Sequence, residues 1–261
     1  ALAISGYARA MRWGGQPAYG QRAEEIWNFV EKEMNRPDGS LIHRWRDGKK
    51  DEVQLLEDYA ALVQALVDLH QATLEIRSLR RATELAGMML EKFEDRAGGG
   101  CWSTADQALL ARMKDDYDGA EPSGNATAAL ALAELGRLTD DPRWMEASRR
   151  ILNWLGERMR RLPQAVPHAL LALQRLYEPP ARLVLAGPWP GLELEAFRLA
   201  AGTVYRPDLM VTRADPEHPS EFIRSLAAQA KTATAFFCEG SACRPPVSRS
   251  EDLIQELKRT A

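Results

Sequence analysis

Hydrophobic residues recur at helical spacing through the first two-thirds of the chain. The period predicts seven helices, over residues 1–13, 18–35, 55–73, 78–94, 124–138, 142–160 and 164–177. Asp141 fits an N-cap, and Pro142 fits the first helical position behind it. Short breaks join the helices in pairs, and each pair runs from a helix rich in small residues to one with larger, aromatic residues. This pattern indicates degenerate repeats of one helical hairpin.

The pattern changes after Glu178-Pro179-Pro180. Strands are predicted over residues 182–186, 208–212 and 232–238, and helices over 192–201, 220–230 and 251–259. Strands that alternate with helices are typical of a parallel sheet. The predicted fold is therefore a mainly helical domain, residues 1–178, followed by a small α/β domain with a parallel sheet, residues 179–261.

Two long connections, residues 36–54 and 95–122, separate the hairpins. In a ring of hairpins these connections emerge on one face, together with the N-termini of the inner helices. The unpaired N–H groups and positive dipole ends of those helices point to the same face. Because functional groups concentrate on loops that a rigid scaffold holds, we expect the functional site there.

The densest set of chemical groups is the segment from Lys114 to Asn125. It holds four carboxylates within seven residues, and Ser123 is placed to cap the helix that follows. Crowded carboxylates shift one another's pKa, which an acid and a base require. The candidate catalytic residues here are Asp116, Asp118 and Glu121, and the candidate substrate-binding residues are Lys114, Ser123 and Asn125. The alternative is a solvated acidic turn with an ordinary N-cap.

A second candidate group lies at the start of the predicted helix 55–73. Asp58 is a candidate catalytic carboxylate at the helix mouth, and Tyr59 is a candidate substrate ligand. An acidic first turn that complements the helix dipole is the alternative. Arg44 and Trp45 follow His43 in an alternating segment that suggests a hairpin, and an aromatic ring beside arginine suits a sugar or carboxylate ligand.

Composition narrows the function. The net charge is −3, with basic and acidic residues interleaved, which argues against nucleic acid as a partner. No apolar run approaches the roughly 18 residues of a membrane span. No residues have metal-ligand spacing, and we expect neither a metal nor another cofactor.

The three cysteines are too few for a disulfide scaffold. We expect Cys238 and Cys243 to be reduced structural thiols, with a reversible disulfide or an intermolecular redox contact as the alternative. Reduced thiols favour a cytoplasmic location. The first residues lack an initiator Met and begin inside a helical pattern, so we expect the chain to start within a longer protein.

Several segments together resemble the spermatogenesis-associated, thioredoxin-domain-containing proteins and their bacterial YyaL-type relatives. These segments are Leu56-Glu-Asp-Tyr-Ala60, Gly98-Gly-Gly100, Lys114–Asn125 and Cys238-x4-Cys243-Arg244-Pro245-Pro246. The resemblance implies part of an (α/α)6 toroid of the six-hairpin glycosidase type, akin to N-acylglucosamine 2-epimerases. It also implies a thioredoxin-like domain ahead of this segment in the full-length protein.

Two functions follow. The first is an enzyme or enzyme-like domain that acts on a sugar or polyol, by hydrolysis between two carboxylates or by epimerisation, for which His43 is the only well-placed histidine. The second is a non-catalytic module that brings a ligand or partner to the thioredoxin-like domain.

Overall fold

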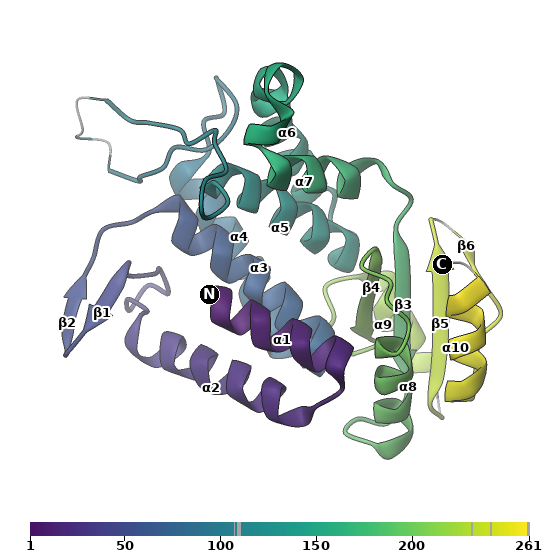
Figure 1. The fold of residues 1–261 in the computed structure, drawn as a ribbon. Coiled ribbons are helices and arrows are strands. Elements are labelled where there is room, and N and C mark those ends of the chain that lie inside the picture. Colours follow the sequence, from purple (N-terminus) through teal and green to yellow (C-terminus); the bar gives the residue numbers. More distant parts are fainter. Residues whose placement is uncertain (107, 109–110, 231, 241, 260–261) are drawn as a thin grey trace.

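Helices build the first part of the fold, as three antiparallel hairpins and one further helix (Figure 1). The computed structural model describes residues 1–106, 108, 111–230, 232–240 and 242–259. The helices are α1 Leu2–Gly14, α2 Pro17–Glu33, α3 Leu56–Thr73, α4 Ile76–Phe93, α5 Gly124–Thr139, α6 Pro142–Arg161 and α7 Pro167–Tyr177, with a 3-10 turn at Pro163–Ala165 ahead of α7. All seven predicted helices are confirmed, with small shifts at their ends.

The hairpins α1–α2, α3–α4 and α5–α6 stand next to one another. Helix α3 packs against α1 on one side and α5 on the other, and α5 in turn packs against α7. Helices α1, α3, α5 and α7 thus form an inner layer, while α2, α4 and α6 lie outside it (Figure 1). This arrangement is a partial toroid of helical hairpins.

Capping residues set where the helices begin and end. Ser123 accepts a hydrogen bond from the Ala126 N–H at 3.1 Å, and Asp141 accepts one from the Arg143 N–H at 3.0 Å. Helices α3 and α5 end on residues with positive φ, Leu74 at 62° and Asp140 at 57°. The breaks inside the hairpins are short because each chain reversal takes place at one such residue.

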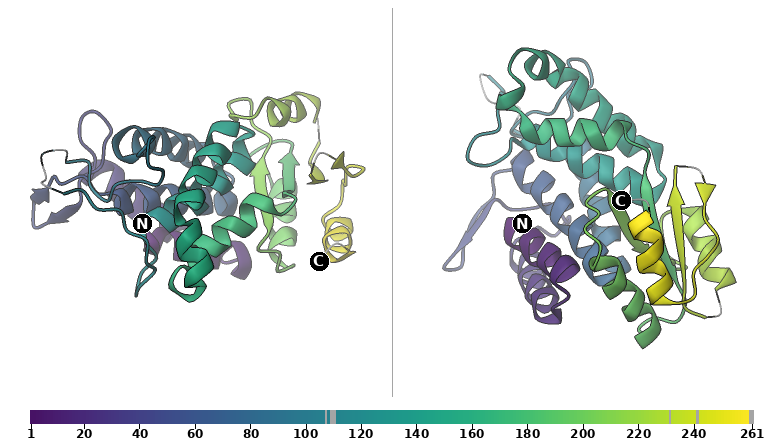
Figure 2. Two further views of the ribbon diagram at one scale, coloured as in Figure 1. Left: turned by 90° about the horizontal axis from the view of Figure 1, so that it is seen from above. Right: turned by 45° about the vertical axis from the view of Figure 1, so that its right-hand side comes forward.

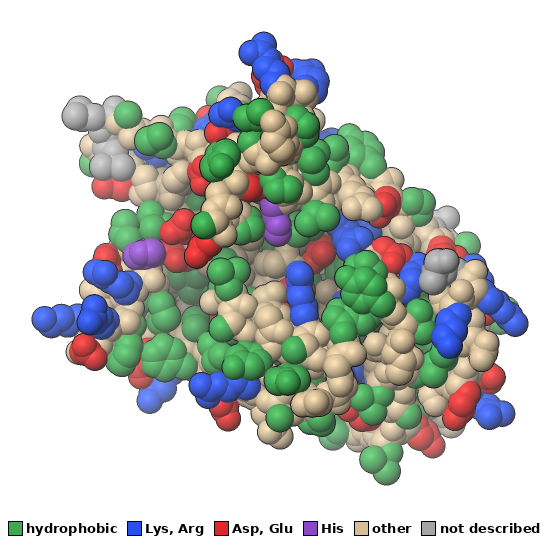
Figure 3. Space-filling model, viewed as in Figure 1, with side chains coloured by type: hydrophobic (Ala, Val, Ile, Leu, Met, Phe, Trp, Pro, Cys, Tyr) green, Lys and Arg blue, Asp and Glu red, His purple; other side chains and the backbone are tan. Residues whose placement is uncertain are grey.

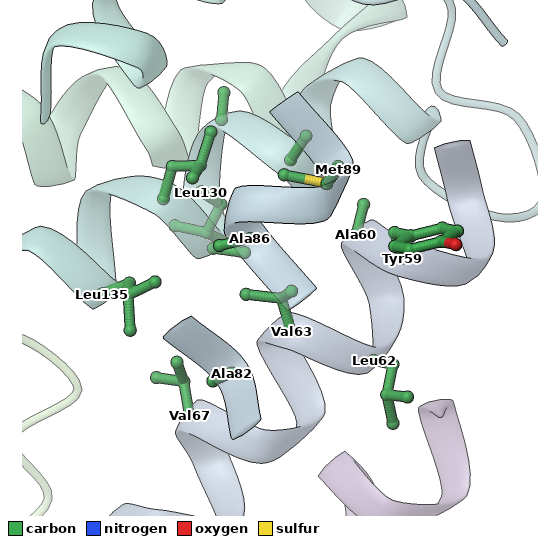
Figure 4. Packing of buried hydrophobic residues seen from close by; sticks show 14 of the residues in the cluster. Tyr59, Ala60, Leu62, Val63, Val67, Ala82, Ala86, Met89, Leu130 and Leu135 are labelled. Atoms are coloured by element: carbon green, nitrogen blue, oxygen red, sulfur yellow. The ribbon is translucent and has the colours of Figure 1, made fainter. Parts of the chain in front are cut away.

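The core lies between the inner helices and their outer partners. Inner helix α3 is buried along almost its whole length, as expected of a helix enclosed by neighbours. In Figure 4, Val63 and Val67 of α3 lie among Ala82 and Ala86 of α4 and Leu130 of α5. Small side chains at these contacts let the helix axes approach closely.

The second part is a small sheet with helices on both faces (Figure 2). Its strands are β3 Ala181–Ala186, β4 Leu209–Arg213, β5 Thr234–Glu239 and β6 Ala242–Cys243, in the order β4-β3-β5-β6. Helices α8 Leu192–Gly202 and α10 Ser250–Arg259 cover one face, and α9 Glu221–Gln229 packs on the other. The order of strands and helices matches the prediction except for β6, which was not predicted.

The prediction of a parallel sheet is wrong. Strand β3 pairs in parallel with β4 but antiparallel with β5. Thr234, which begins β5, is paired with Ala186, which ends β3. The connection through α9 therefore begins and ends at the same edge of the sheet. For this reason β5 runs antiparallel to β3.

The two parts share an interface at the C-terminal ends of α1 and α3. Leu74 enters the hydrophobic core of the sheet, and Arg12 donates a hydrogen bond to the Leu209 carbonyl at 2.5 Å. His70 Nε2 lies 2.8 Å from the Thr212 hydroxyl. Specific contacts therefore hold the α/β part against the helical part.

The expectation of reduced thiols at Cys238 and Cys243 is also wrong. The structure joins them in a disulfide across the β5–β6 hairpin. The two cysteines are partners in the antiparallel β5–β6 ladder, with Cα atoms 3.9 Å apart. Cys101 is free and buried. The disulfide removes the argument for a reducing compartment.

Among the described helices, none combines the length and hydropathy that a bilayer crossing requires.

Candidate functional site

The main cavity opens where the inner helices begin. Its volume is about 600 Å³, which lies within the range typical of small-molecule sites. The walls come from the N-terminal parts of the four inner helices, from the C-terminal end of α2 and from both long connections. The lining side chains include Ser5, Arg9, Val30, Met34, Leu41, Ile42, Glu57, Asp58, Leu62, Gln64, Asp115, Tyr117, Glu121, Thr127 and His168. This cavity thus lies on the face where the loop lengths predict the functional site.

Asp58 and His43 form the most distinctive pair in this region. Asp58 stands in the first turn of α3, and His43 precedes strand β1 (Arg44–Arg46), which pairs with β2 (Lys49–Asp51). The His43 Nδ1 atom lies 3.0 Å from one carboxylate oxygen of Asp58 and 3.3 Å from the other. Removal from water raises the pKa of Asp58 to about 6, although the hydrogen bond with His43 acts in the opposite direction.

This pKa has a chemical consequence. A carboxyl group with a pKa near 6 is present in both protonation states close to neutral pH, so it can give up and take back a proton. An ordinary aspartate is almost entirely ionised under the same conditions. Asp58 is therefore suited to proton transfer, with His43 fixing its orientation.

Three side chains here also lie close enough to offer ligand atoms to a cation. One atom each from His43, Glu57 and Asp58 falls within 4.8 Å of the others, the one such group in the described part of the chain. However, the imidazole nitrogen and the Asp58 carboxylate are already hydrogen-bonded to each other. The same imidazole and carboxylate are also within reach of each other for acid–base chemistry.

The opposite wall is formed by the connection before α5 and by α7. Glu121 and Asp115 are exposed acidic residues, and Tyr117 presents a largely exposed ring. His168, in the first turn of α7, is half-buried, and burial lowers its pKa. Its imidazole is therefore neutral at pH 7.

The acidic segment divides into groups with different surroundings. Glu121 lines the cavity. Asp116 lies outside the lining and forms an ion pair with Arg158 at 2.6 Å. Asp118 accepts hydrogen bonds from the backbone N–H groups of Ser123 and His168, both at 2.8 Å. Asp118 therefore holds the connection against α7, and its carboxylate oxygens are already engaged.

The candidate substrate-binding residues of this segment make structural contacts. Ser123 caps α5. Asn125 is fully buried and brackets Cys101, accepting from its N–H at 2.7 Å and donating to its carbonyl at 2.9 Å. Lys114 bonds Asp95 at 2.6 Å and lies over the ring of Trp102. None of these three side chains lines the cavity.

The remaining candidates also lie outside the lining. Tyr59 is buried, accepts a hydrogen bond from the Leu41 N–H at 3.0 Å and donates one to Gln54 at 2.5 Å. It thereby anchors the first long connection to α3. Arg44 is exposed on the hairpin, and Trp45 packs edge-on against Phe29, with ring centroids 5.3 Å apart.

Several lining residues were not identified from the sequence, among them Arg9, Gln64, Tyr117 and His168. For Gln64 a signal exists: a long polar side chain sits within the otherwise apolar centre of an inner helix. His168 follows Pro167 at the start of a helix, where nothing local distinguishes a site residue from a surface residue.

Comparisons with known proteins found relatives that match almost the whole chain. It is 31% identical to spermatogenesis-associated protein 20 of Homo sapiens over 265 residues, which is 95% of this chain and 34% of that protein. An uncharacterised protein of Caenorhabditis elegans is 27% identical over 97% of this chain and 36% of its own length. The chain thus spans about a third of the curated relatives it matches. No family model matches it.

Two solved structures were also found to be similar. One is a cellobiose 2-epimerase from Spirochaeta thermophila, with a TM-score of 0.49 and 21% identity over 58% of this chain and 40% of that chain. The other is a GH76 α-mannanase from Bacteroides thetaiotaomicron, with a TM-score of 0.47 and 17% identity over 58% of this chain and 41% of that chain.

Proposed function

We propose that the cavity is an acid–base site for a sugar or similar polyol, with Asp58 as the proton-transferring residue and His43 as its positioning partner. The observation that carries this proposal is the Asp58 carboxyl, half-buried on the cavity wall with its pKa raised to about 6. Carboxyl groups with strongly shifted pKa values that lie in clefts are characteristic of functional sites.

The lining supports a polyol as the ligand. Carboxylates and the Gln64 amide oxygen accept hydrogen bonds, which sugar hydroxyl groups can donate. Tyr117 offers an aromatic ring at the rim, with 57% of its surface exposed, for the apolar face of a sugar ring. The cavity is large enough for a mono- or disaccharide.

A reaction on a sugar also needs a second group. Glu121 is the candidate from the acidic segment, because it lines the cavity and forms no ion pair among the described residues. Asp116 and Asp118 are assigned to the structure of the connection, since their carboxylates are bound to an arginine and to backbone N–H groups.

The test uses the chain with a panel of neutral and amine-bearing mono- and disaccharides in D2O, followed by proton NMR. Epimerisation exchanges a carbon-bound hydrogen for solvent deuterium, whereas hydrolysis produces a new reducing end. The proposal requires one of these signals, and Asp58→Asn should abolish it. If no sugar binds or reacts, or if Asp58→Asn reacts at the wild-type rate, the proposal is overturned.

The second candidate function is a non-catalytic binding module that serves a thioredoxin-like domain. It is favoured by length, because the matched segment is only 34% of the human relative. In this case the sugar panel should give binding without deuterium exchange or new reducing ends.

A further inference from the structure

A buried acceptor atom on the cavity wall has no partner. Gln64 lines the cavity and is 7% exposed, and its Oε1 atom has no hydrogen-bond partner among the described residues. A buried polar atom without a partner is costly and uncommon, so it calls for an explanation.

The orientation of this amide is set by its neighbours. The Gln64 Nε2 group donates to a carboxylate oxygen of Glu134 at 2.7 Å. An ionised carboxylate can only accept, so the nitrogen must face Glu134, and the oxygen is left on the other side. The guanidinium of Arg175 lies 3.7 Å from the other Glu134 oxygen. Gln64 therefore keeps an acceptor atom without a donor, on a side chain that lines the cavity.

The charge of the lining indicates which kind of donor fits. Four carboxylate side chains line the cavity, Glu57, Asp58, Asp115 and Glu121, against one guanidinium, Arg9. Arg9 is already paired with the buried Asp68 at 2.9 Å. Figure 3 shows acidic side chains gathered on this face between two histidines. The four carboxylates thus outnumber the positive groups of the lining, even with the N-terminal amine of Ala1 counted beside Arg9.

We infer that Gln64 is a ligand-binding residue that, with the surrounding carboxylates, selects a sugar or polyol bearing a protonated amine. The ammonium group supplies the donor that Gln64 lacks and the positive charge that the lining lacks. An anionic ligand, such as a sugar phosphate or uronate, is repelled by the same carboxylates. This inference rests on the proposed function and specifies its ligand.

The test compares glucosamine, glucose and glucose 6-phosphate as probes, by calorimetric titration of the chain at low salt. The inference predicts that glucosamine binds at least tenfold more tightly than glucose, that glucose 6-phosphate binds most weakly, and that added salt narrows the difference.

Two variants assign the preference to residues. Gln64→Met keeps the side-chain volume but removes the acceptor, and it should weaken glucosamine binding by roughly ten- to hundredfold, the usual range for a hydrogen bond to a charged group. Glu121→Gln should reduce the preference for glucosamine over glucose. Its matched control is Glu146→Gln, an exposed residue of α6 outside the lining, which should leave the preference unchanged.

The outcomes separate this inference from the proposed function. If glucosamine and glucose bind equally, or if folded Gln64→Met keeps wild-type glucosamine affinity, the inference is wrong while the sugar site stands. Circular dichroism of the unliganded variant shows whether it is folded. If Gln64→Met does not fold, the Glu121→Gln comparison decides alone, and an unchanged preference refutes the inference. Failure of all three probes to bind refutes both proposals.

Discussion

Replacing Asp58 with asparagine should stabilise the protein while it removes proton transfer. At pH 7 the folded protein keeps Asp58 ionised although burial disfavours the charge, because the pKa is raised from 3.8 to about 6. At 1.36 kcal/mol per pKa unit, this difference corresponds to about 3 kcal/mol of lost stability. The side chain is 24% exposed, so solvent screening reduces the cost, and we expect a gain of roughly 1–2 kcal/mol from the substitution.

The sign of the effect can be tested with pH. The folded state binds a proton at Asp58 more tightly than the unfolded state, so the cost is present above pH 6 and disappears as the pH falls toward 3.8. Thermal unfolding followed by circular dichroism should therefore show a higher melting temperature for Asp58→Asn at pH 7, by roughly 4 °C, and almost no difference at pH 4.

The matched control for this experiment is Glu57→Gln. Glu57 occupies the same first turn but is exposed, so its replacement removes both a favourable interaction with the helix dipole and the repulsion of Asp58, and the melting temperature should change little. Two results would refute the argument that burial of the Asp58 charge costs stability. One is a lower melting temperature for Asp58→Asn than for the wild type at pH 7. The other is a difference between variant and wild type that is the same at pH 7 and pH 4.

Three further predictions concern the rest of the fold. Burial lowers the pKa of His70 to about 4, so the unfolded chain takes up a proton below pH 6.5 that the folded chain does not, and stability should fall between pH 6.5 and 4; urea unfolding should show a smaller fall for His70→Gln. Reduction of the Cys238–Cys243 disulfide, which closes a short loop, should cost about 2 kcal/mol in the same assay, and an unchanged midpoint would contradict this. Asp118→Ala should lower stability by roughly 2 kcal/mol because it leaves two backbone N–H groups without their acceptor, whereas Asp116→Ala, which breaks a partly exposed ion pair, should cost under about 1 kcal/mol; equal losses would argue against the structural role of Asp118.

Local chemistry explains why the helices could be predicted. The apolar period of α3 and the Asp141-Pro142 start of α6 are both encoded within a few residues. The direction of β5 is different, because it depends on where the connection through α9 ends relative to β3. An alternating order of strands and helices is compatible with either direction.

The candidate site also combines features that the local sequence encodes with features that depend on distant residues. The position of Asp58 on the cavity wall could be predicted because a carboxylate at the mouth of an inner helix faces the loops, whatever lies further along the chain. For Asp116 and Asp118 the local sequence is equally acidic, but their partners Arg158 and His168 lie more than 40 residues away. Only the packing of α6 and α7 against the connection decides that these carboxylates are engaged.

The cysteines give a further example of this limit. The spacing of Cys238 and Cys243 matches no common redox or zinc motif, and it was interpreted as a pair of thiols. The register of the β5–β6 hairpin places the two residues opposite each other, which the spacing of the cysteines does not reveal.

The central claim is that Asp58 is a proton-transfer group held in a sugar-binding cavity. The most direct test is a carbon-13 NMR titration of the aspartate carboxyl groups, in which the Asp58 signal is identified by its absence in Asp58→Asn. The account predicts a midpoint near pH 6 that moves when a bound sugar is added. A midpoint near 3.8, unchanged by every sugar in the panel, would contradict it.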